Sequence, residues 1–180
     1  MDRTLKTSIW HQFGATIDYL ADTVSDCPDR LWVSPMWNNP NEPPEFSQVW
    51  YRVYHALFWL DLYLTGAEEG FVPPAPFTLI EQDDDGPLPE RPYTKQELQA
   101  YLNECRQRCR ATIEALTDET ARRICRFPWG EASFLELLLY NMRHVQEHAS
   151  QLSLLLGQQG VSVSDYVTQT NSDVSGGTSL

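Results

Sequence analysis

The chain has 180 residues and a mass of 20.7 kDa, a size typical of one domain with its own hydrophobic core. Its formal net charge of −12 argues against a surface that gathers phosphates, because nucleic-acid binding normally depends on clustered Lys and Arg. No apolar run has the length of a signal peptide core or a membrane span. We therefore expect a soluble cytoplasmic protein without nucleic-acid or membrane partners.

Prolines divide the chain, because a proline inside a helix breaks it. Eleven of the twelve prolines fall in two windows, 28–44 and 73–92, and Pro128 marks a third break. Between the breaks, four segments carry apolar residues at helical spacing: about 4–25, 46–66, 94–116 and 133–157. This order predicts an all-α four-helix bundle in residues 1–160, with long Pro-rich loops between helices 1 and 2 and between helices 2 and 3.

The first two predicted helices differ in how much of their surface is apolar. The first carries a single inward stripe at steps of three and four, made by Ile9, Phe13, Ile17, Leu20 and Val24. The second, FSQVWYRVYHALFWLDLYL, is apolar or aromatic nearly all round, which predicts the most buried helix. His55 lies in its middle, where a histidine would need a polar partner.

The third and fourth predicted helices both open with a capping-box pattern. Thr94 is followed three residues later by Glu97, and Ser133 by Glu136. The third helix also holds a cysteine pair one turn apart, which we interpret as packed side chains rather than half of a metal site. Reduced thiols are expected for all four cysteines, because no secretory signal is present.

The fourth predicted helix contains the most informative stretch, RHVQEHASQL, at residues 143–152. Its His144 and His148 are four residues apart, so both imidazoles lie on one helical face about one turn apart. Two side chains so placed can bind one transition-metal ion without bending the backbone. They flank the apolar arc of the helix, and Asn141 and Gln151 extend a polar seam along nearly the same line.

The same residues also match the H-x-x-E-H pattern of inverted zinc peptidases, with Glu147 in the place of the general base. That pattern is short, and those peptidases take their third ligand from a helix well downstream. Here only about thirty residues follow, and Glu147 projects away from the apolar arc. The sequence therefore favours a simple metal site over a peptidase.

A histidine in the second helix, followed by H-x-x-x-H-x-x-Q-L in the fourth and a Leu-rich turn ending in Gly, resembles the DinB-like (YfiT-related) metal-binding bundles. The resemblance covers roughly residues 4–160. It implies that His55, His144 and His148 bind a divalent ion, most often zinc or nickel, and that at least one position is left to water or substrate. It also implies an enzyme that transfers a low-molecular-weight thiol to an electrophile, or a hydrolase-like one, and a possible homodimer.

The remaining segments leave alternatives open. The Pro-rich loops hold large aromatic residues, which favour a lid over an apolar patch but also suit a dimer surface. The acidic run 81–85 is expected to be a solvated turn, and the polar segment 161–180 a flexible tail. The site itself has two other interpretations: a non-catalytic metal- or ligand-binding bundle, which Asp61, Glu147 or a cysteine as fourth ligand would favour, and a bundle whose histidines bind nothing.

Overall fold

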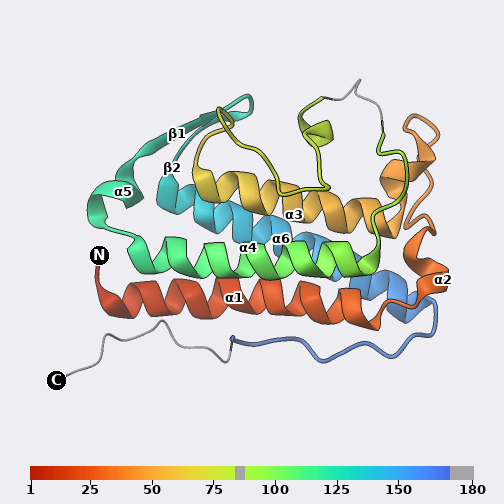
Figure 1. The fold of residues 1–180 in the computed structure, drawn as a ribbon. Helices are drawn as coiled ribbons and strands as arrows, with labels where there is room; N and C mark the ends of the chain where they lie inside the picture. The colour runs from red at the N-terminus through yellow and green to blue at the C-terminus, as the bar shows by residue number, and fades with distance from the viewer. Residues whose placement is uncertain (84–87, 171–180) are drawn as a thin grey trace.

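The computed structural model describes residues 1–83 and 88–170, and most of them are helical (Figure 1). Four long helices occupy the four segments where the sequence predicts them: α1 (Arg3–Asp26), α3 (Val49–Thr65), α4 (Lys95–Ala115) and α6 (Phe134–Gln158). Short helical turns join them: α2 (Asp29–Trp32), η1 (Pro44–Ser47), η2 (Ile80–Gln82) and α5 (Asp118–Arg122). The predicted mostly helical class is confirmed. Within the described residues, no helix is long and apolar enough to cross a membrane.

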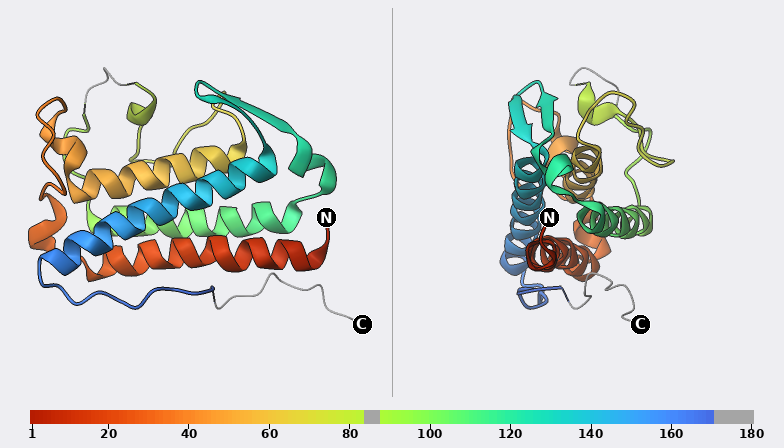
Figure 2. Two further views of the ribbon diagram at one scale, coloured as in Figure 1. Left: turned by 180° about the vertical axis from the view of Figure 1, so that it is seen from behind. Right: turned by 90° about the vertical axis from the view of Figure 1, so that its left-hand side faces the viewer.

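The four long helices pack side by side, so that α6 and α4 each lie between α1 and α3 (Figures 1 and 2). The helices α3 and α4 run in the same direction, opposite to α1 and α6 (Figure 1). A parallel neighbour cannot be reached by a short turn, because the chain must first return along the full length of the preceding helix. The long connection from Gly66 to Thr94 makes this return over α3.

Side-chain caps fix where the long helices begin. The carboxylate of Asp2 accepts a hydrogen bond from the backbone N–H of Leu5 and caps α1. Both predicted capping boxes form, at the start of α4 and at the start of α6. These caps satisfy backbone N–H groups that a helix leaves without an internal partner.

A small hairpin that the sequence analysis did not predict lies between α5 and α6. Its strands β1 (Ile124–Phe127) and β2 (Gly130–Ser133) pair antiparallel, with Cys125 opposite Ala132. Each strand has only four residues, too few for a clear alternating pattern. The predicted break at Pro128 falls at the turn of this hairpin, and Ser133 ends the second strand and caps α6.

The described part of the C-terminal segment, residues 161–170, runs back along α1 (Figure 1). Thr170 at its end is buried and donates its hydroxyl to Asp18, and Arg106 in turn donates to that hydroxyl. A methyl group on Gly14 would lie 2.7 Å from the Thr170 side chain, so this close approach requires glycine on α1. The rest of the predicted tail lies outside the described residues.

The most buried carboxylate of the helical core is that of Asp61 on α3, which is 1% exposed. It accepts hydrogen bonds from the Arg108 guanidinium at 2.6 and 2.7 Å and from the Tyr101 hydroxyl at 3.1 Å. Both donors lie on α4, so this group joins two parallel helices. A buried carboxylate is tolerated only with such partners.

We predict that Arg108→Leu lowers the free energy of unfolding by about 3 kcal/mol, because Asp61 would stay buried with one neutral donor. Urea unfolding followed by circular dichroism at pH 7 measures the change. Arg126→Leu is the matched control, since the Arg126–Glu131 pair is largely exposed and contributes about 0.5 kcal/mol or less. Equal losses in the two variants would contradict the assignment.

Candidate metal centre

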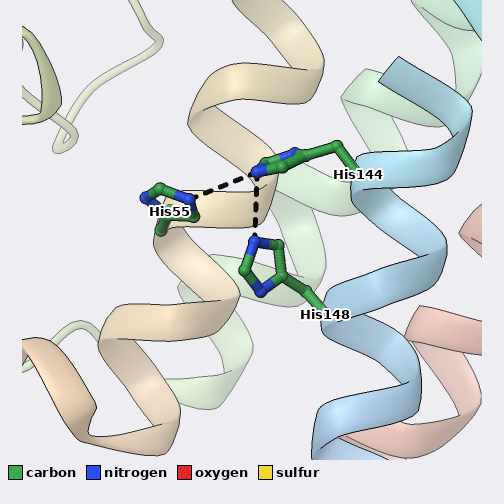
Figure 3. Close-up of side chains that lie close together, drawn as sticks. All are labelled: His55, His144 and His148. Carbon is green, nitrogen blue, oxygen red and sulfur yellow. Dashed lines mark hydrogen bonds between the residues drawn. The ribbon is translucent and has the colours of Figure 1, made fainter. Parts of the chain in front are cut away.

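Three histidines from two helices converge on one point between α3 and α6 (Figure 3). His144 Nε2 lies 3.2 Å from His55 Nε2 and 3.0 Å from His148 Nε2. The helical spacing of four residues stacks His144 and His148 on α6, as predicted, and α3 brings His55 across to them. The structure thus assembles all three histidines that the sequence analysis singled out.

The separations of these nitrogens match those around a metal ion. Imidazole nitrogens lie about 2.0–2.1 Å from zinc, so two of them in a tetrahedral site are about 3.3 Å apart. Two nitrogens at right angles around an octahedral ion are about 2.9 Å apart by the same bond length. The observed 3.0 and 3.2 Å fall between these values. Two of the three separations therefore fit a divalent ion, and the three ligand atoms all lie within 4.8 Å of one another.

The hydrogen bonds on the far side of the rings direct lone pairs toward the centre. Nδ1 of His55 lies 2.5 Å from Glu81 Oε2, and Nδ1 of His148 lies 2.9 Å from Gln151 Oε1. In a neutral imidazole whose Nδ1–H donates to such an acceptor, the Nε2 lone pair is free. A neutral His144 carries at most one N–H for its two neighbours. Hydrogen bonding among the rings is incomplete, and a cation at the centre would satisfy all three nitrogens.

Two of the three imidazoles are held neutral by their surroundings. Burial, followed by the neighbouring histidines, lowers the pKa of His144 to about 2 and contributes with His55 to lowering the pKa of His148 to about 4. At neutral pH both rings are therefore uncharged, and each has one ring nitrogen that carries no proton. Neutral imidazole is the form that ligates metal ions.

Glu81 is the one residue of this centre that the sequence analysis missed, because the acidic run 81–85 was interpreted as a solvated turn. The structure shows the opposite for Glu81, whose side chain is 6% exposed and also accepts a hydrogen bond from Trp59 Nε1 at 3.1 Å. Burial works to raise the pKa of Glu81, but the bond and charge of His55 outweigh it and hold the pKa below its usual value. Its acidic neighbours at 84 and 85 lie outside the described residues.

The other residues considered as ligands lie elsewhere. The Asp61 carboxylate accepts hydrogen bonds from Arg108 and Tyr101. Glu147 is exposed and accepts a hydrogen bond from Gln151 Nε2 at 3.2 Å. The cysteines are buried and unpaired, and burial raises the pKa values of their thiols. Within residues 1–83 and 88–170, only the three histidines come close enough together to share an ion. In that part of the chain, no fourth protein ligand joins them.

A pocket of about 390 Å³ opens beside His55, whose side chain is 21% exposed. Side chains of the first connection (Asn41, Glu42, Pro43 and Phe46), of the second (Ile80, Glu81 and Asp83) and of α3 line it. The pocket is large enough for a small molecule, and both Pro-rich connections form its walls. A ligand in it would approach the histidines from the side of α3.

These features define a class: mostly helical proteins in which a group of three histidines can hold a divalent metal ion. The family model described as the DinB superfamily matches residues 12–152, a span that includes all three histidines. The chain belongs to the DinB superfamily, as its histidine pattern predicts. No curated protein matches it.

We predict that Glu81→Ala weakens zinc binding about 10- to 100-fold, because a ligand histidine without its outer hydrogen-bond partner loses orientation and basicity. Competition with a chromophoric chelator measures the dissociation constant. Gln82→Ala removes a neighbouring exposed side chain and should leave the affinity unchanged. Equal affinities of the Glu81→Ala variant and the parent would show that Glu81 does not orient His55.

Proposed function

We propose that this chain is a divalent-metal-dependent enzyme in which His55, His144 and His148 bind the ion and a low-molecular-weight thiol is transferred to an electrophile. The observation that carries the proposal is the convergence of three imidazole nitrogens beside a pocket, with no fourth protein ligand among the described residues. Catalytic zinc sites typically have three protein ligands and one open position. The thiol as substrate is what the family resemblance implies.

A divalent ion held by three imidazoles would keep its charge and would lower the pKa of a thiol or water bound beside it. The chain's own residues then have three tasks. Glu81 and Gln151 hold the rings of His55 and His148 in orientation. The buried helix faces limit access of water from the side of α6, and the pocket beside His55 admits the substrate.

The proposal extends to finer features of the protein. We infer a DinB/YfiT-like four-helix bundle formed by residues 1–160, zinc or nickel as the resident ion, and a homodimer in the cytoplasm. Imidazole ligands suit both metals, so availability and geometry decide between them. Hydrolase-like use of the same ion is the neighbouring possibility, because a water can take the place of the thiol.

The first test is elemental analysis of protein purified without chelator or metal-affinity tag. We expect close to one equivalent of metal in the parent and none in His55→Ala, His144→Ala or His148→Ala, because two imidazoles bind far more weakly than three. His11→Ala is the matched control, since His11 is the one histidine outside the cluster and that variant should keep its metal. A folded parent that binds neither zinc nor nickel on addition would contradict the proposal.

The second test is thiol transfer itself. We expect the metal-loaded parent to accelerate thioether formation between cysteine or glutathione and 1-chloro-2,4-dinitrobenzene, followed by absorbance, and His144→Ala to return the rate to that without protein. A tightly bound metal ion that no thiol coordinates and that supports no reaction would favour the alternative, a non-catalytic metal- or ligand-binding bundle.

A further inference from the structure

We propose that Arg52 recognises an anionic group, most simply a carboxylate, on the small molecule that binds at the histidine centre. The inference rests on the proposed function and narrows its substrate class. Nothing in the histidine motif points to this residue. The evidence is its position, its surroundings and its lack of an ion-pair partner among the described residues.

Arg52 lies on α3 one turn before His55, so the two side chains share a face of that helix. It lines the pocket beside His55, and it also lines a small internal void together with His148. The Arg52 side chain therefore lies beside His55 and His148.

A cation in this place is unfavourable unless an anion accompanies it. Arg52 is partly buried, and a divalent ion bound by the histidines would add a repulsion that little solvent screens. The whole chain has a formal net charge of −12, so the positive charge of Arg52 at this place is opposite in sign to that of the protein as a whole. An anionic ligand that contacts both the ion and Arg52 would convert this repulsion into attraction.

The carboxylates near Arg52 do not neutralise it by direct contact. Glu81 directs Oε2 to His55 and Trp59, while Glu42 and Asp83 are exposed residues at the edge of the pocket. Among the described residues, no ion pair joins Arg52 to a carboxylate, and its buried Nε has no hydrogen-bond partner. Glu81 and Glu42 attract the charge of Arg52, but neither carboxylate forms an ion pair with it.

The guanidinium also contacts an aromatic ring. Its central carbon lies over the ring of Trp37, 4.7 Å from the ring centroid. A cation–π contact of this kind restrains the guanidinium and is compatible with hydrogen bonding along its edge. A planar carboxylate matches that edge with two parallel hydrogen bonds. The geometry therefore suits a compact ligand with a carboxylate a few bonds from the atom that meets the metal.

The test uses three small thiols that differ in one group: 3-mercaptopropionate, 2-mercaptoethanol and cysteamine. Each is titrated under anaerobic conditions into the cobalt(II)-loaded full-length protein, and binding is followed by the visible absorption of the ion. We expect the parent to bind 3-mercaptopropionate at least tenfold more tightly than 2-mercaptoethanol. In Arg52→Gln this preference should fall to below threefold, while the affinity for 2-mercaptoethanol changes little.

Two controls isolate the role of Arg52. Arg143→Gln removes the same charge from an exposed position on α6 and should keep the preference. Arg52→Lys keeps the charge without the fork of donors and should retain part of it, which also guards against a folding defect in Arg52→Gln. A preference that survives in Arg52→Gln would mean that the carboxylate binds the metal, and would overturn the inference. A preference for cysteamine would also overturn the inference, because it would mean that Glu42 and Asp83 at the edge of the pocket select a cationic ligand.

The outcomes separate this inference from the proposed function. If the parent takes up no cobalt, or if no thiol alters the cobalt spectrum, the metal–thiol proposal fails and the inference fails with it. If 2-mercaptoethanol binds and the carboxylate adds nothing, the inference alone is wrong.

Discussion

The parallel course of α3 and α4 is the constraint on which the histidine centre depends. After α3 the chain must return along that helix before α4 can begin, and this return carries η2 over the middle of α3. Glu81 lies on η2, and it accepts the hydrogen bond of His55 Nδ1 there. A short turn between antiparallel helices would leave the outer edge of His55 exposed. The long connection between α3 and α4 therefore supplies the hydrogen-bond partner of His55.

Two buried polar side chains, Asn141 and Asp61, each join α3 to a neighbouring helix. Asn141 on α6 donates its amide to the backbone oxygen of Leu60 on α3, at 3.0 Å, one turn before His144. Asp61, the residue after Leu60, turns the other way and joins α3 to α4. Because both contacts are buried, sliding α3 along either neighbour would leave unpaired polar atoms. These bonds help to keep the three imidazoles in register.

The helices and the three histidines could be predicted from the sequence because their determinants are local. Capping boxes, prolines and apolar spacing act within a few residues, and the spacing of His144 and His148 follows from helical geometry alone. The place of His55 came from the family resemblance, whose helix order sets it opposite that pair. The DinB superfamily match confirms this resemblance. The strands of the short hairpin before α6 have too few residues to show the alternation of apolar and polar residues that predicts a strand.

Glu81 and Arg52 could not be found in this way, because their roles arise from tertiary contacts. An acidic run after prolines has the composition of a solvated loop, and only the path of the chain over α3 turns Glu81 inward. Arg52 lies within an apolar helix, where the flexible side chain of an arginine commonly reaches the surface. Its stacking on Trp37 depends on where the first connection lies. The sequence does show one relation between them, because Arg52 and His55 are three residues apart on the same predicted helix.

The balance of charge around the histidines bears on whether the centre is catalytic. A structural site closes its coordination sphere with protein ligands, and the negative charges of those ligands neutralise the ion. Here the three candidate ligands are imidazoles, which bring no negative charge, and the nearest carboxylate, Glu81, acts on His55 from the outside. Arg52 adds a further positive charge on the side of the pocket. A divalent ion held by these three imidazoles would thus keep a positive charge, and an anionic ligand would be attracted to it.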